Sequence, residues 1–205
     1  MSFANYTELK DSVQSWLADR TDLNTKVDDF LKLCEADINS LPDFRLKDQE
    51  TIVSLTPSSS VVTLPTDYLE WRQVTLKSSP RRNLTFVAPS TVEQWYADRA
   101  SSPGNHFTVI GSSLYVYPLI TDQVELIYYA KVPALSATAT TNWLLTKKPN
   151  VYLFGTLRYA GVYEQDDEMT QRYGGLYSAA MMELIAADRG ARYARTAQRQ
   201  SGPTS

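Results

Sequence analysis

The sequence offers few side chains for acid–base or nucleophilic chemistry. His106 is the only histidine and Cys34 the only cysteine among the 205 residues. A Ser-His-Asp or Cys-His arrangement would have to use His106, which lies at the start of an expected strand, where a turn or edge role is more common. Cys34 lies on the apolar side of an expected helix and is better explained as a small buried hydrophobic residue. One histidine and one cysteine also exclude most zinc sites.

No paired carboxylates lie within an otherwise apolar stretch, and two groups of acidic residues have structural explanations. Asp28-Asp29 and Asp166-Asp167-Glu168 each lie near the start of an expected helix, where the helix dipole favours acidic side chains. No GxGxxG or P-loop motif is present. The sequence therefore predicts a protein with no catalytic residues, no cofactor, no metal and no enzymatic activity.

Arginines recur near the carboxyl end at spacings of three, three and four residues: Arg189, Arg192, Arg195 and Arg199. On a helix they form one positive stripe, and no acidic residue follows Asp188. One interpretation is charge complementarity at a helix carboxyl end with a solvated face. The other is a docking tail that becomes ordered when an acidic partner surface supplies carboxylates.

The aromatic content is also high, with thirteen tyrosines, four tryptophans and six phenylalanines. One interpretation is a core that uses tyrosine at its solvent-facing margins. The other is an extensive protein contact surface, where tyrosine and tryptophan are enriched. A platform for stacking sugars is a weaker alternative, because no cluster of polar residues accompanies the rings.

Composition points to an ordinary globular protein, with 43% hydrophobic and 21% charged residues. The net charge of −3 argues against a general binder of polyanions. The longest uncharged run, residues 100–121, is broken by proline and glycine and is no membrane span. The amino-terminal residues show no basic and apolar pattern typical of a signal peptide.

Helical periodicity marks both ends of the chain. Apolar residues from Leu9 to Leu17 and from Val27 to Leu41 recur at spacings of three and four, with Thr25 expected to cap the second helix and Pro42 to follow it. Two further helices are expected after Pro149 and from Asp166, the latter containing the Gly174-Gly175 pair, which indicates a close helix crossing or a bend.

The middle of the chain changes to a period of two and holds seven of the ten prolines. Gly111-Ser112 between alternating apolar residues predicts a hairpin. Residues 124–130 are apolar on both faces, so their strand should be central or covered. Ser90 and Glu93 fit a capping box that opens a short helix inserted between strands.

These patterns predict an α+β fold, in which helices from both ends form one bundle around a β-rich insertion. The expected parts are a helical hairpin over residues 1–47, the insertion over 48–140, carboxyl-terminal helices over 141–197 and a flexible tail over 198–205.

Four stretches in the same order resemble the head-to-tail adaptor (connector) proteins of tailed bacteriophages, which bind the portal. They are residues 6–17, residues 64–76 (LPTDYLEWRQVTL), residues 126–135 (LIYYAKVPAL) and residues 142–157, which run on into the helix ending near Arg192. None of them is a reaction signature. Together they cover nearly the whole chain.

The resemblance implies a helical bundle with a β-rich insertion and a ring of subunits, commonly twelve, beneath the portal. The ring would link the portal protein to a tail or nozzle protein and extend the channel through which genomic DNA passes. The protein would reside in the virion at the head–tail interface, and in the host cytoplasm during assembly, without a membrane. The position of Arg189, Arg192, Arg195 and Arg199 in the chain makes them the candidates for docking on the portal.

Two other functions compete with this hypothesis. A carbohydrate- or surface-binding module would use Trp71, Trp95 and strand tyrosines as stacking rings. A small hydrolase would need an acid and a nucleophile that converge on His106.

Overall fold

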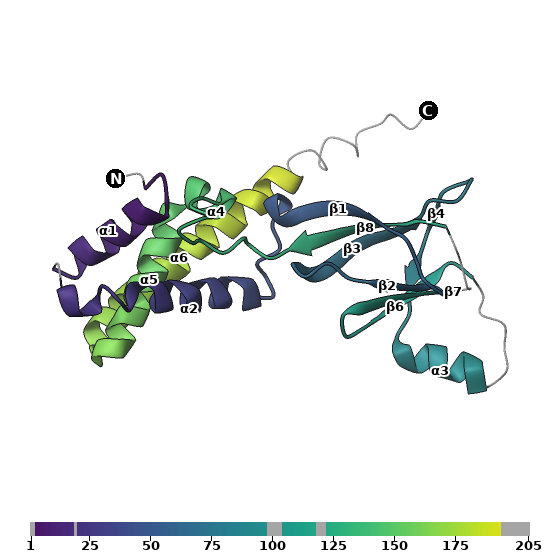
Figure 1. Cartoon of the computed structure of the whole chain (residues 1–205), viewed down its shortest axis with the longest axis horizontal. Helices are drawn as coiled ribbons and strands as arrows, with labels where there is room; N and C mark the ends of the chain where they lie inside the picture. The colour runs from purple at the N-terminus through teal and green to yellow at the C-terminus, as the bar shows by residue number, and fades with distance from the viewer. Residues whose placement is uncertain (1–2, 19, 98–103, 118–121, 194–205) are drawn as a thin grey trace, which may run out of the picture. The chain divides into compact units, whose positions relative to one another are not determined.

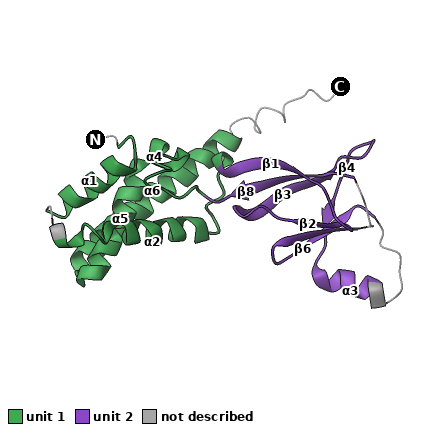
Figure 2. Cartoon of the chain, in the orientation of Figure 1, with its two compact units in different colours: residues 1–48, 132–205 green, residues 49–131 purple. Residues whose placement is uncertain are grey.

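A computed structural model describes residues 3–18, 20–97, 104–117 and 122–193. The chain forms two compact units, which Figure 2 distinguishes by colour. Residues 1–48 and 132–205 make the helical unit, and residues 49–131 make the strand unit. The mixed α+β class predicted from the sequence is confirmed.

The helical unit is built around one central helix, α5 (Pro149–Glu164). It contacts α1 (Tyr6–Trp16), α2 (Val27–Ser40), α4 (Trp143–Lys147) and α6 (Asp167–Tyr193) (Figure 1). Because helices cover it on several sides, α5 buries apolar residues around most of its circumference rather than along one stripe.

Two glycines allow α5 to approach its neighbours closely. A Cβ atom added at Gly155 would lie 2.3 Å from Cys34 Sγ of α2, and one added at Gly161 would lie 2.9 Å from the backbone nitrogen of Thr170 in α6. In contrast, a Cβ at Gly175 would meet nothing within 4 Å. A close helix crossing was one of the two interpretations of the Gly174-Gly175 pair. The closest crossings instead lie at Gly155 and Gly161.

The described residues of the strand unit form two four-stranded sheets that share one core. The first has the order β1 (Glu50–Leu55), β8 (Val124–Ala130), β3 (Tyr68–Leu76), β4 (Arg82–Asn83). The second has the order β2 (Val61–Thr63), β7 (Ser113–Tyr117), β6 (His106–Ile110), β5 (Thr85–Phe86), in which only the β5–β6 pair is parallel. The predicted central strand is confirmed as β8, and the predicted hairpin joins β6 to β7 at Gly111, whose φ is +60°.

The segment after β8 belongs to the helical unit, although the sequence predicted that residues 132–140 are part of the insertion. Val132 and Leu135 are buried in the helical core. Their backbone N–H groups donate to Asn39 Oδ1 (2.8 Å) and Glu35 Oε1 (2.7 Å) of α2. Side-chain acceptors on a distant helix thus fix this extended segment, and composition alone does not reveal them.

Two helix starts also differ from the prediction. Lys26, not Thr25, precedes α2, and no side chain caps this end. The inserted helix α3 (Pro89–Ala97) begins at Pro89, one residue before the expected cap, since proline suits a first helical turn, where no backbone N–H is needed.

Candidate functional site

The carboxyl end of α6 carries part of the predicted arginine stripe. Arg189 is exposed, whereas Arg192 is partly buried. Arg192 Nε lies 2.6 Å from Asp188 Oδ2, and its Nη2 donates to the backbone oxygen of Arg45 at 3.2 Å. Arg195 and Arg199 lie outside the described residues. Arg192 therefore holds the end of α6 against the segment after α2, and Arg189 presents its charge to solvent.

Asp188 completes this connection. Its side chain is 7% exposed, and it accepts the Lys47 N–H at 3.1 Å in addition to the Arg192 pair. A buried carboxylate needs such partners, because the loss of hydration is otherwise costly.

Three lysines lie near this end of α6, two of them paired with acidic side chains. A cavity of about 250 Å³ is lined by Lys47, Lys147 and Lys148 together with Asp188 and apolar residues of α6. Lys147 pairs with Asp48 at 2.5 Å and Lys148 with Glu183 at 2.7 Å. No spacing pattern in the sequence groups these lysines with the arginines, because they lie more than thirty residues away along the chain.

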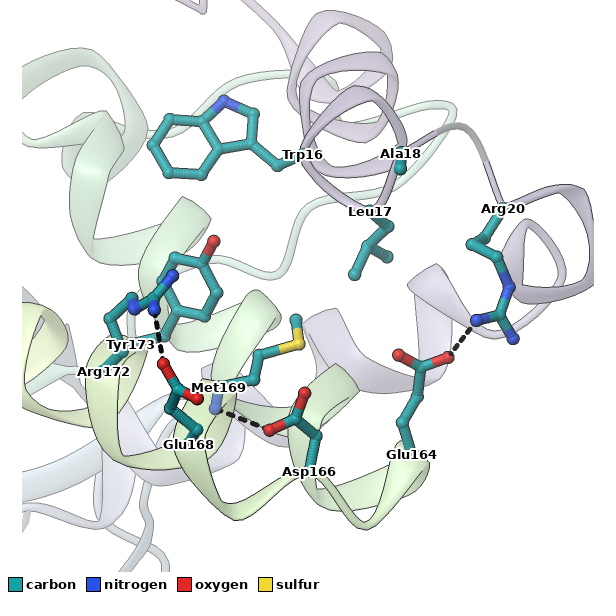
Figure 3. Close-up of a pocket in the computed structure, with 10 residues that line it drawn as sticks. All are labelled: Trp16, Leu17, Ala18, Arg20, Glu164, Asp166, Glu168, Met169, Arg172 and Tyr173. Carbon is teal, nitrogen blue, oxygen red and sulfur yellow. Dashed lines mark hydrogen bonds and ion pairs between the residues drawn. The ribbon is translucent and has the colours of Figure 1, made fainter.

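A second cavity, of about 390 Å³, lies at the other end of α6 (Figure 3). The end of α1 and the chain after it form one wall, with Trp16, Leu17, Ala18 and Arg20. The α5–α6 turn and the first turns of α6 form the opposite wall, with Glu164, Asp166, Glu168, Met169, Arg172 and Tyr173.

Two ion pairs border this cavity. Arg20 lies 2.9 Å from Glu164, and Arg172 lies 2.8 Å from Glu168. Arg20 also forms a two-pronged contact with Asp22, at 2.8 and 2.7 Å, which raises the pKa of Arg20 and lowers that of Asp22.

A third hollow, of about 370 Å³, is mainly apolar and lies between α2 and α6 over α5. Its borders include Leu41 and Met182, which are 36% and 70% exposed. Its lining includes Arg158, which pairs with Asp37 and lies over the Tyr177 ring at 4.9 Å. Exposed apolar side chains that gather around one hollow, rather than a single exposed residue, are typical of a surface that contacts another protein.

The residues considered for chemistry occupy structural positions. Cys34 is fully buried, and burial raises the pKa of its thiol. The His106 ring lies 5.3 Å from the Trp95 ring, in an edge contact. Trp71 packs on Phe86 and Phe107 at 5.6 and 5.1 Å. The two tryptophans of the sugar-stacking hypothesis therefore contact other rings of the strand unit.

No group of three or more histidine, cysteine, aspartate or glutamate side chains in the described part of the chain could hold a metal ion. Within the same ranges, no helix is long and apolar enough to cross a membrane.

The sequence matches the SU10 adaptor protein family over residues 4–201. The chain belongs to this family. No curated protein matches the chain. Membership of the SU10 adaptor family supports a bacteriophage structural adaptor that resides in the virion and binds other phage structural proteins. It is also consistent with a protein that is not an enzyme.

Proposed function

We propose that this SU10 adaptor family member forms a ring of twelve subunits beneath the portal and joins the portal to a tail or nozzle protein. The observation that carries this proposal is the family match over nearly the whole chain. The surfaces of the helical unit support it, because an adaptor needs separate contacts for its own copies and for each partner.

A closed ring requires a heterologous contact, in which one face of each subunit meets a different face of the next. The apolar hollow between α2 and α6 has the character of one such face, since Met182 and Leu41 are exposed at its border. Burying large apolar side chains of this kind supplies most of the free energy of subunit association.

The basic end of α6 is the proposed portal contact. Arg189 is exposed, and Lys47, Lys147 and Lys148 lie around the neighbouring cavity. Arginine pairs with two carboxylate oxygens at once, so an acidic portal surface would be recognised with defined geometry. Arg192 serves this contact indirectly by holding the helix end in place, and Arg195 and Arg199 extend the proposed contact along the chain.

Genomic DNA is proposed to pass through the ring without a specific contact. Phosphate neutralisation by lysine and arginine dominates the affinity of proteins for DNA. The net charge of −3 therefore disfavours DNA binding by the chain as a whole.

Binding to purified portal rings tests the proposal. The full chain should add density at the narrow end of the portal in electron micrographs. Arg189→Glu combined with truncation after Tyr193 should weaken binding without unfolding the helical unit, because the Arg192–Asp188 pair is kept. Arg82→Glu is the matched control, since Arg82 is an exposed arginine of the strand unit. Absence of wild-type density on the portal would refute the proposed function.

A further inference from the structure

Strand β1 forms one edge of its sheet and pairs with β8 alone (Figure 1). All six of its residues align with β8 without a register shift. Because the backbone groups of successive residues point to opposite sides of a strand, about half of those in residues 51–55 face away from β8. No backbone hydrogen bond joins these groups to another part of the described chain. An unpaired row of this kind is a template for a further strand.

The other sheet edges in the described residues are short, irregular or charged, as is usual for edges that stay uncovered. The end strands β2, β4 and β5 have three, two and two residues. Where β3 extends beyond β4, residues 68–73 contain Glu70, Arg72 and two register shifts against β8. Residues 108–110 of β6, which extend past β5, stop at the hairpin turn. In contrast, residues 51–55 (TIVSL) of β1 contain no charge, proline or register shift.

Side chains along the β1 edge are apolar on both faces of the sheet. Ile52 lies on the outer face, opposite Ile127 of β8, and is 64% exposed. Val53 and Leu55 lie on the other face and are only partly buried against the core of the strand unit. A strand added at this edge would therefore place side chains beside Ile52 on one face and beside Val53 and Leu55 on the other, where apolar residues fit best.

Charged side chains near the edge do not guard it, because they pair with one another. Glu50, at the start of β1, pairs with Arg72. Lys77 donates to the Ser54 hydroxyl at 2.6 Å and also lies 3.5 Å from Glu125. A charge on the incoming segment would lose hydration without gaining a new partner, so the segment should be uncharged where it meets β1.

A second copy of the chain does not suit this edge. Two β1 strands paired with each other would be related by a two-fold axis, which the subunits of one ring between portal and tail do not share. Pairing with the open part of β3 in the next copy would meet the charges and register shifts of residues 68–73. The occupant is therefore a segment of a different protein.

We propose that the edge of β1 binds an extended, uncharged segment of the tail or nozzle protein as an added strand. Backbone hydrogen bonds to residues 51–55 supply the affinity, and alternate apolar side chains beside Ile52 and Val53 set the register. The assignment rests on the proposed adaptor function, in which the portal and the neighbouring subunit both contact the helical unit. The strand unit is then the part that remains for the third partner.

The synthetic peptide acetyl-KTVTVTVTK-amide, whose terminal lysines keep it soluble, tests the edge in the full chain. Alternate N–H groups of residues 51–55 should exchange rapidly with deuterium in the free protein, and saturating peptide should slow their exchange. The same peptide with N-methyl groups on its three central residues keeps every side chain but loses donors, so it should bind about tenfold more weakly. Unchanged exchange, or equal affinity of the two peptides, would overturn the proposal.

Ile52→Lys puts a charge on the edge without disturbing the core, because this side chain is exposed. It should weaken peptide binding about fivefold, the factor expected for one lost cross-strand pair. Ile110→Lys is the matched control, since it makes the same change at a side chain that is 49% exposed in the other sheet. Equal weakening by the two substitutions would overturn the proposal, because added positive charge alone would then explain the effect.

Complementation of a phage that lacks the protein separates this inference from the adaptor function. Ile52→Lys should give heads that carry the adaptor on the portal but fewer attached tails than Ile110→Lys. Equal tail attachment with the two variants would refute the strand site and leave the adaptor function standing. A wild-type dimer that Ile52→Lys dissociates would also refute it, because the occupant would then be a second copy. Absence of the wild-type protein from portal rings would instead refute the adaptor function, whatever the peptide shows.

Discussion

The contact between α2 and α5 makes Gly155→Ala the most direct test of the packing of the helical unit. A Cβ atom at this position would lie 2.3 Å from Cys34 Sγ and 3.1 Å from two ring carbons of Tyr177. Atoms in favourable contact are separated by about 3.5–4 Å, so one helix would have to move by more than roughly 1 Å. Neither Cys34 nor the Tyr177 ring can yield easily, because both are buried.

The expected cost is the balance of two opposing effects. Overpacking of a dense core costs about 1–3 kcal/mol, and the short Cβ–Sγ distance places this site near the upper value. Alanine gains about 1 kcal/mol over glycine inside a helix. We therefore expect Gly155→Ala to lower the free energy of unfolding by about 2 kcal/mol.

Urea unfolding followed by far-ultraviolet circular dichroism measures this change, because nearly all described helices belong to the helical unit. Gly175→Ala is the control in the same unit. Its Cβ would meet nothing within 4 Å, so the variant should be more stable than the wild type by up to about 1 kcal/mol.

A second substitution identifies the cause. Cys34→Ala alone should destabilise by about 1 kcal/mol through a small cavity. Combined with Gly155→Ala it should recover most of the lost stability, because the new methyl group fills the space of the removed sulfur, which gives a favourable coupling of about 2 kcal/mol. The close α2–α5 contact would be refuted if Gly155→Ala were as stable as Gly175→Ala. It would also be refuted if the two substitutions in the double variant had additive effects on stability.

Two further predictions concern polar side chains buried in the helical unit. Burial raises the pKa of Glu35, against the opposing effect of the Leu135 N–H hydrogen bond, so the folded protein binds this proton more tightly than the unfolded chain. The stability of the unit should therefore fall as pH rises from about 4.3 through the raised pKa, and Glu35→Gln should be more stable than the wild type at pH 7 but not at about pH 3. Asn142 accepts the Leu145 N–H (2.8 Å) and donates to Pro133 O (2.7 Å) and the Tyr152 hydroxyl (2.6 Å), so Asn142→Ala should cost about 3 kcal/mol in urea unfolding.

Each of these predictions has a clear contrary result. An unchanged pH profile of unfolding in Glu35→Gln would show that burial of the ionised Glu35 carboxylate does not lower the stability of the unit. A loss below about 1 kcal/mol in Asn142→Ala would show that water replaces its three hydrogen bonds at little cost.

Local patterns predicted much of the fold because they report on local causes. The period of two around Gly111 predicts the β6–β7 hairpin, and the two apolar faces of residues 124–130 predict the central position of β8. The apolar line through Cys34 predicts a buried thiol, which the structure confirms. The arginine spacing predicts a basic helix end, and Arg189 is exposed there.

The sequence by itself determined the helices at both ends of the chain, the hairpin at Gly111 and the buried strand over residues 124–130, because periodicity and turn chemistry act over a few residues. Only the tertiary structure decided what those residues meet. It pairs Arg192 with Asp188, makes Gly155 the close crossing between α2 and α5, and joins Val132 and Leu135 to α2. These outcomes depend on contacts between residues far apart along the chain, and the spacing of residues within a segment carries no information about them.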